Sequence, residues 1–183
     1  MLKLGLDTES LHLWFQNKRM DIFGFIEKAH ELGFDGVMIN ILKDYNLDPE
    51  WGTLMNNDPA HLKRVRDLLE SYHMYAELAT KGITKEHLLK VLDVAEALAA
   101  DIIRTYIPIT LNPLASRATG GEGKYDQAKV RGDFDPAVFD EAAMSLRQII
   151  PELKKRRIRL ALENHEYETS DELTACLLYT SPS

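Results

Sequence analysis

A cluster of acid, amide and imidazole side chains follows a short apolar run near the end of the chain. The run is Ile158 to Leu162, and Glu163, Asn164 and His165 come directly after it. A carboxylate in such a position can take a proton from a substrate carbon and return it, which is general acid and base chemistry. We therefore predict Glu163 as a catalytic residue. Asn164 and His165 are predicted substrate contacts, although either could instead cap the next helix.

The elements around this cluster explain why Glu163 stands out. Ile158 to Leu162 is expected to form a strand, and Thr169 and Glu172 have the spacing of a capping box that begins a helix. In parallel α/β proteins, functional groups gather at the carboxyl ends of strands, because the strands themselves are buried on both faces. Glu163 occupies such an end.

Three further polar residues stand at or near the ends of expected strands. Arg104 could hold a phosphate or carboxylate through two parallel hydrogen bonds. Glu77 places a carboxylate near the end of the third strand, and His12 follows the first strand. We predict all three as substrate contacts, with a purely structural contact as the alternative for His12. Four histidines on helices or helix ends are expected on the surface: His30, His61, His73 and His87.

Strand-like and helix-like patterns alternate along the chain. Short apolar runs predict strands at 2–6, 34–42, 74–79, 101–107 and 158–162, with amphipathic helices between them. About five βα units of this kind predict an α/β fold with a parallel sheet. An open doubly wound sheet and a closed eight-stranded barrel both fit this alternation. Pro151 is expected to kink or shorten the helix that precedes the last strand.

Neither of two candidate segments has the residues of a nucleotide-binding loop. Asp7-Thr8-Glu9-Ser10, after the first strand, lacks the glycines of a dinucleotide-binding turn. Around Gly123-Lys124, Ala118 and Tyr125 replace the leading glycine and the hydroxyl residue of a phosphate loop. Residues 108–134 show no convincing periodicity, and a loop of this length is usually functional or disordered.

Composition narrows the class of protein. The chain has 183 residues, 45% hydrophobic and 28% charged, which suits one folded core. Its formal net charge of −7 argues against a surface that binds nucleic acid. No apolar run approaches the length of a membrane span, so we expect no membrane association and a cytoplasmic location. The one cysteine, Cys176, excludes an internal disulfide.

Several segments carry a resemblance to a known family. They are Gly5-Leu6-Asp7 with Ser10-Leu11-His12, the turn from Leu32 to Gly36, and above all Leu160 to His165 with Thr169 to Leu173. Over residues 1–175 the chain resembles the sugar phosphate isomerase/epimerase family, whose members have the xylose isomerase-like TIM barrel. The resemblance implies that the chain forms a partial (β/α)8 TIM barrel.

The resemblance also implies an activity. It is the metal-dependent isomerisation or epimerisation of a sugar, a sugar phosphate or a related polyol or keto compound. The metal would be Mn²⁺, Mg²⁺, Co²⁺ or Zn²⁺, with Glu163 as one ligand and as one of two acid/base groups. Such a reaction removes a proton next to a carbonyl, and the enediolate that results needs a cation beside its oxygens. A homo-oligomer is left open.

Two other functions remain as alternatives. An endonuclease-IV-like phosphodiesterase would share the fold, but it tends to use histidines at the early strand ends, where this chain has Asn40 and Glu77. A non-catalytic sugar-binding barrel would keep the pocket without a full set of metal ligands.

The last eight residues differ from the rest of the chain. Cys176 to Ser183 end in Ser-Pro-Ser without a helical stripe and look like a translated sequencing adapter. We therefore expect residues 1–175 to be the N-terminal part of a barrel, residues 176–183 to be non-native, and this chain to be inactive by itself.

Overall fold

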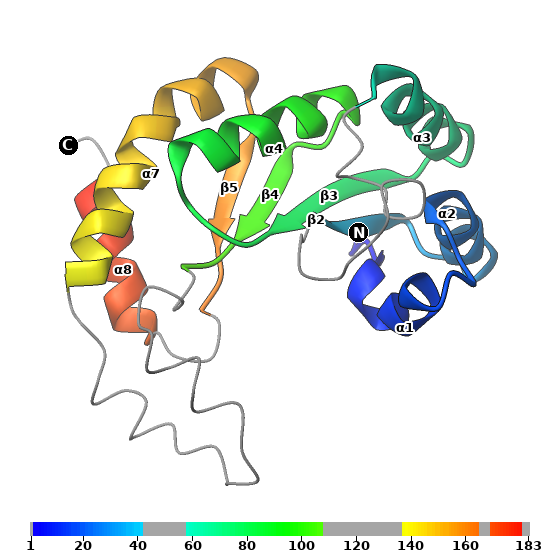
Figure 1. Ribbon diagram of the computed structural model, residues 1–183, viewed down its shortest axis with the longest axis horizontal. Coiled ribbons are helices and arrows are strands. Elements are labelled where there is room, and N and C mark those ends of the chain that lie inside the picture. Colours follow the sequence, from blue (N-terminus) through cyan, green and yellow to red (C-terminus); the bar gives the residue numbers. More distant parts are fainter. Residues whose placement is uncertain (1, 42–57, 108–136, 165–168, 181–183) are drawn as a thin grey trace, which may run out of the picture.

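Five parallel strands form a curved sheet with helices along its outer side (Figure 1). The computed structural model describes residues 2–41, 58–107, 137–164 and 169–180. The strands are β1 (Gly5–Asp7), β2 (Gly36–Ile41), β3 (Tyr75–Thr80), β4 (Ile102–Thr105) and β5 (Arg159–Leu162). The helices are η1 (Thr8–Leu11), α1 (His12–Gln16), α2 (Ile22–Glu31), α3 (Pro59–Ser71), α4 (Lys85–Ala97), α7 (Ala137–Arg156) and α8 (Ser170–Thr180).

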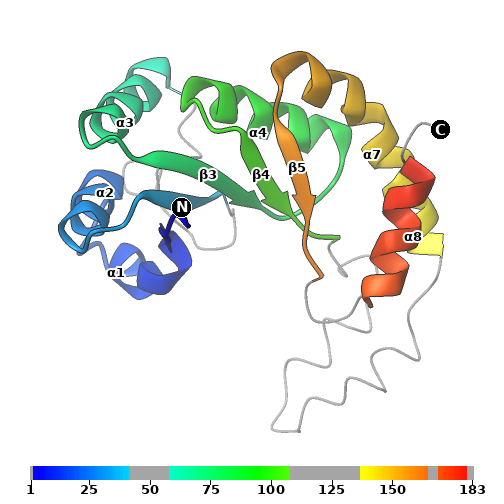
Figure 2. The same ribbon diagram turned by 180° about the vertical axis from the view of Figure 1, so that it is seen from behind.

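The order of the strands decides between the two expected architectures. Each strand pairs in parallel with the one before it in the chain, in the order β1-β2-β3-β4-β5. A doubly wound sheet would reverse this order at a switch point and place helices on both faces. Here the order never reverses, and α2, α3, α4 and α7 follow one another along the outer side (Figure 2). The predicted partial (β/α)8 barrel is confirmed.

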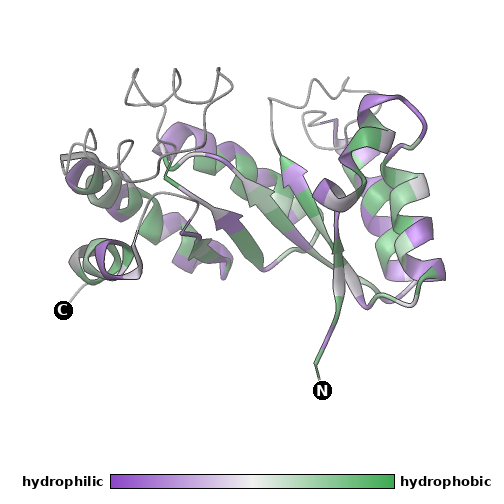
Figure 3. Cartoon of the chain, turned by 90° about the horizontal axis from the view of Figure 1, so that it is seen from below, coloured by the Kyte–Doolittle hydropathy of each residue, from purple (hydrophilic) through white to green (hydrophobic). Residues whose placement is uncertain are grey.

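The two faces of the sheet carry different residues. The outer face is apolar, and Val37, Ile39, Leu78 and Ile103 on it have no exposed surface. Their neighbours along the strands point to the opposite, concave face because side chains alternate in a strand. Hydrophilic residues lie near the arrowheads of several strands (Figure 3). The core therefore lies between the sheet and the helices, and the concave face is free to carry polar groups.

Local signals set most of the helix boundaries. Asp21, Asp58 and Thr84 accept hydrogen bonds from backbone N–H groups in the first turns of α2, α3 and α4. The predicted capping box is present: Thr169 N–H donates to Glu172 Oε2 at 2.7 Å, and Glu172 N–H donates to Thr169 Oγ1 at 3.3 Å. The sequence thus specified where these helices begin.

Other local predictions need correction. The short helices η1 and α1 were not expected, because residues 8–16 lack a helical apolar stripe. Pro151 does not shorten α7, which continues for five more residues to Arg156. There, Arg156 forms ion pairs with Asp93 at 2.6 Å and Glu96 at 3.2 Å, which tie α7 to α4.

The ends of the described chain bear on several earlier predictions. The helix α8 packs against α7 and runs to Thr180, with Cys176 buried and Leu178 71% exposed. The non-native origin of residues 176–183 stays a prediction. The predicted loop at 108–134 and the predicted site residue His165 lie outside the described residues. No helix in the described ranges is long and apolar enough to cross a membrane.

Candidate active site

Glu163 lies where the sequence predicts it, directly after β5. Its backbone N–H donates to the carbonyl of Thr105 at 2.8 Å, which continues the pairing of β5 with β4. Its side chain is 29% exposed and reaches Arg104, with Oε2 3.4 Å from Nε of the guanidinium. The carboxylate is therefore held beside the carboxyl ends of β4 and β5, half-shielded from solvent.

Arg104 connects Glu163 to a third residue that the sequence did not single out. Its Nη2 atom lies 3.5 Å from Oδ2 of Asp7, the last residue of β1. The guanidinium thus bridges acids from β1 and β5 across the concave face. In the sheet, β2 and β3 lie between β1 and β4. Arg104 on β4 can reach Asp7 on β1 because the sheet is curved. A signal for Asp7 did exist, because it ends its strand just as Glu163 does.

Neighbouring groups hold Asp7 firmly. Its Oδ1 atom accepts hydrogen bonds from Glu9 N–H at 2.9 Å and from Asn40 Nδ2 at 2.6 Å. Asn40 is buried at the end of β2, and its backbone N–H donates to Thr8 Oγ1 at 2.9 Å. Asp7 therefore has partners on both carboxylate oxygens, and Asn40 serves to orient it.

Glu77 lies deeper in the sheet than expected. It is in the middle of β3, in register with Met38 of β2, and half-buried. The sequence predicted a strand over 74–79, and β3 ends one residue later at Thr80, so Glu77 lies one residue further from the strand end than expected. Its contact with a substrate stays a prediction. Glu77 influences Tyr75, two residues away on the same face. Burial raises the pKa of the Tyr75 hydroxyl, and the nearby charges of Glu77 and Asp35 raise it further.

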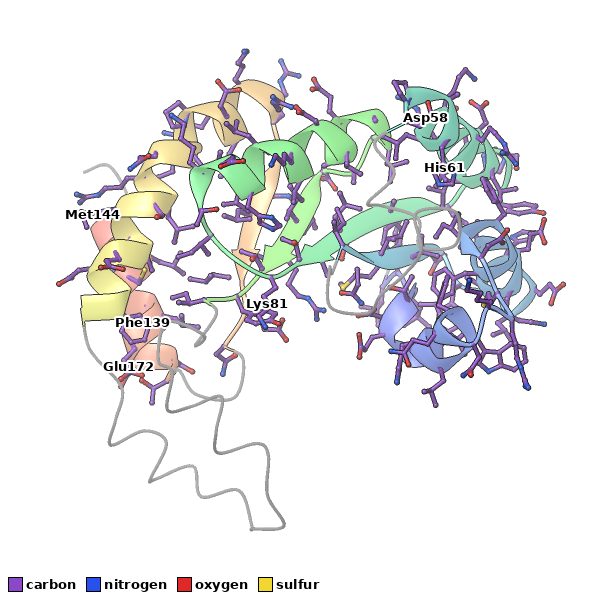
Figure 4. All side chains as sticks on the ribbon, viewed as in Figure 1. Asp58, His61, Lys81, Phe139, Met144 and Glu172 are labelled. Carbon is purple, nitrogen blue, oxygen red and sulfur yellow. The ribbon has the colours of Figure 1, made fainter. Side chains whose placement is uncertain are left out.

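The other predicted contacts are more peripheral. His12 is half-buried at the start of α1, and its Nδ1 atom lies 2.8 Å from the carbonyl oxygen of Glu9. Asn164 follows Glu163 and is exposed. Of the predicted site residues, only Glu163 and Arg104 are brought into direct contact in the described part of the chain. Lys81 follows β3 and adds a cation at the same end of the sheet (Figure 4).

His87 is not the surface residue that its helical position suggested. Its Nε2 atom lies 2.8 Å from Thr80 Oγ1, which itself donates to the carbonyl of Ile41 at 3.1 Å. Both bonds form together when Nε2–H of His87 is the donor. Burial lowers the pKa of His87, and the charge of Lys90 lowers it further. This polar group lies behind the sheet and fastens the turn between β3 and α4.

The carboxylate of Glu163 meets part of what a divalent metal ion requires from a protein site. A partly exposed carboxylate at a strand end is a suitable oxygen ligand for Mg²⁺ or Mn²⁺. Within the described ranges, however, no three His, Cys, Asp or Glu side chains come together in a group that could hold a metal. Glu163 is thus a suitable single ligand by its chemistry, but the described residues do not assemble a complete metal site around it.

Comparisons with known proteins agree with the fold. No family model matches the chain. A curated relative, 3-oxo-isoapionate decarboxylase of Pectobacterium atrosepticum, is 29% identical over 126 residues, which cover 68% of this chain and 38% of the relative. The chain thus spans less than half of the length of this curated protein.

Three solved structures share the architecture. D-psicose 3-epimerase, solved in the presence of D-fructose, matches with a TM-score of 0.61 and 16% identity. The D-psicose 3-epimerase of Clostridium cellulolyticum H10, solved with D-tagatose, matches with a TM-score of 0.61 and 13% identity. A xylose isomerase-like TIM barrel protein from Mycobacterium smegmatis, in complex with magnesium, gives 0.60 and 15%.

These matches cover nearly all of this chain but only part of each structure. They include 98%, 98% and 97% of the chain, and 60%, 60% and 61% of the three solved proteins. The predicted resemblance to xylose isomerase-like TIM barrels is confirmed for the fold.

Proposed function

We propose that this chain is part of a metal-dependent isomerase or epimerase of a sugar or a related polyol or keto compound. One observation carries the proposal: Glu163 ends β5 on the concave face of a barrel whose structural neighbours include sugar epimerases. In TIM barrels this end of the strands holds the active site. A phosphorylated sugar remains within the proposed substrate class.

Glu163 is the proposed acid/base group. Its carboxylate would take a proton from the carbon next to the substrate carbonyl and return it to another carbon or face. His12, Glu77, Asn164 and His165 are the proposed polar contacts to the substrate. Arg104, also predicted as a substrate contact, pairs with Glu163 and Asp7. All of those within the described residues come from strands or from the segments that follow them.

A divalent cation is the proposed cofactor, from the set Mn²⁺, Mg²⁺, Co²⁺ and Zn²⁺. When bound, it would supply the positive charge that stabilises the oxygens of an enediolate. Glu163 would provide one oxygen ligand. The magnesium complex of the Mycobacterium smegmatis protein supports a divalent cation as the cofactor. The other ligands would come from residues that the described part of the chain does not supply.

The curated relative favours a second candidate, decarboxylation of a 3-oxo acid. Loss of carbon dioxide from such an acid leaves an enolate, which is the same kind of anion that isomerisation forms. Glu163 could then act as the acid that protonates the enolate carbon. The two candidates share a site and differ in the bond that is broken. An endonuclease-IV-like reaction is less favoured, because Asn40 is committed to Asp7 and Thr8.

Metal analysis and substrate assays on the whole protein would test the proposal. We expect stoichiometric Mn²⁺ or a similar ion, and interconversion of ketoses without release of carbon dioxide. The substitution Glu163→Gln should remove activity, whereas Glu86→Gln, an exposed acid on α4, should leave it unchanged. Protein without metal and without an effect of Glu163→Gln would refute the proposal, and carbon dioxide release would favour the second candidate.

A further inference from the structure

We infer that Arg104 is a positioning residue, which fixes the orientation of the Glu163 carboxylate instead of holding an anionic group of the substrate. This inference rests on the proposed function, since it concerns the proposed acid/base group. The observation that carries it is the bridge from Asp7 through Arg104 to Glu163.

The bridge uses different nitrogen atoms of one planar group. Nη2 of Arg104 faces Oδ2 of Asp7 at 3.5 Å, and Nε faces Oε2 of Glu163 at 3.4 Å. The fork of a guanidinium is rigid, so fixing one end against Asp7 also fixes the end that faces Glu163. The ion pair uses Oε2 of Glu163, and we expect Oε1 to face the ligand.

Both ends of the bridge have rigid supports. Arg104 belongs to β4 between Ile103 and Thr105, neither of which has any exposed surface. Asp7 is held by the N–H of Glu9 and by Asn40, which is itself buried. A side chain anchored in this way can restrict the rotation of its partner. Glu163 follows the strand and has three side-chain torsions of its own to restrict.

The charges around Arg104 argue against a role in binding an anionic group of the substrate. The guanidinium carries one positive charge and already faces two carboxylates, and Glu77 adds a third acid on the same face. Lys81, which follows β3, is a further cation at this end of the sheet among the described residues, and it too has an interaction partner. A phosphate or carboxylate would therefore have to displace an existing partner of Arg104. If Arg104 instead orients Glu163, its existing ion pairs stay in place.

The role predicts a specific kinetic signature. A carboxylate that rotates freely is less often in the geometry for proton transfer, so kcat should fall while substrate affinity changes little. We expect Arg104→Lys to lower kcat by about tenfold, since misplacement of a catalytic group by a fraction of an ångström has effects of this order. Asp7→Asn should lower it by less, because the guanidinium would keep its contact with Glu163.

Nuclear magnetic resonance on the 183-residue chain tests the bridge independently of activity. We expect the Nε–H signal of Arg104 to exchange slowly and to shift in both Asp7→Asn and Glu163→Gln. The carboxylate carbon of Glu163 should become more mobile in Arg104→Lys. The matched control is Arg159→Lys, which makes the same substitution in the exposed pair of Arg159 and Asp101 at the opposite end of β5. It should alter neither signal.

The outcomes separate the inference from the proposed function. An Arg104 signal that ignores Asp7→Asn and Glu163→Gln would overturn the inference, whether or not the whole protein is active. So would a rise in KM with kcat preserved in Arg104→Lys, which is the signature of a substrate anion held by Arg104. Coupled signals in an inactive whole protein would support the bridge and refute the proposed function. Asp7→Asn provides the same test if Arg104→Lys fails to fold.

Discussion

The two faces of the sheet differ in chemistry, although the same strands form both: the outer face is apolar and the concave face carries charged side chains. On the outer face, Leu78 and Ile103 are fully buried against the helices. On the concave face, the next residue along, Arg104, is 33% exposed on its side chain and bridges two acids. The first environment stabilises the fold through burial of apolar surface. The second contributes little stability and arranges charges, so substitutions one residue apart should have unlike effects.

The largest effect on stability should come from the outer face. Ile103→Ala should lower the free energy of unfolding by about 2–5 kcal/mol, because it leaves a cavity in a packed core. Arg104→Met should change it by at most about 1 kcal/mol, since partly exposed ion pairs contribute little. Urea unfolding followed by circular dichroism would measure both. Equal losses in the two variants would show that the concave face is as important to the fold as the core.

Asn40 is a buried polar residue on the concave face, and its substitution should have an intermediate effect on the free energy of unfolding. Asn40→Ala should cost about 1–3 kcal/mol, because it removes a buried hydrogen bond to the charged group of Asp7. Met38→Leu is the matched control on the same strand and face, and a swap that conserves volume should cost less. An unchanged melting temperature in Asn40→Ala would contradict this expectation. It would mean that the hydrogen bond from Asn40 to Asp7 is not needed for stability, and that the N–H of Glu9 is sufficient to hold Asp7.

His87 is a polar residue on the otherwise apolar outer side, and it should make a small, pH-dependent contribution to the free energy of unfolding. Burial lowers the pKa of His87 in the folded chain below its ordinary value of 6.5. The unfolded chain then binds more protons, so this contribution is complete above about pH 6.5 and is lost as the pH falls through the folded pKa. His87→Gln should flatten the profile of stability against pH between 7 and 5, by less than about 1.4 kcal/mol per pH unit. An identical slope in both proteins would contradict this.

Local signals in the sequence were sufficient for most of the outer face. The caps Asp58 and Thr84 and the capping box of Thr169 and Glu172 are local patterns, and the structure has each of them. The order of the strands was left open, because strand-helix alternation is common to two architectures. Pro151 was expected to kink or shorten its helix, but α7 continues past it to Arg156, which pairs with Asp93 of α4.

Residue contacts across the concave face were harder to predict. Glu163 could be found because it ends a strand, and Asp7 satisfies the same rule, yet its contact with Arg104 depends on the curvature of the sheet. Glu77 was placed one residue too near the strand end, because Thr80, the last residue of β3, was not included in the predicted strand. His87 was expected to be an exposed helical residue, but it is half-buried and its Nε2 atom lies 2.8 Å from Thr80 Oγ1, a contact that the sequence pattern does not show.

Solvent-deuterium exchange into a ketose tests the role of Glu163 most directly. The whole protein with Mn²⁺ is predicted to exchange the proton next to the substrate carbonyl, and Glu163→Gln to slow that exchange by about 100-fold or more. Circular dichroism should show that the variant keeps its fold. Exchange at an unchanged rate in folded Glu163→Gln would contradict the assignment of Glu163 as the acid/base group.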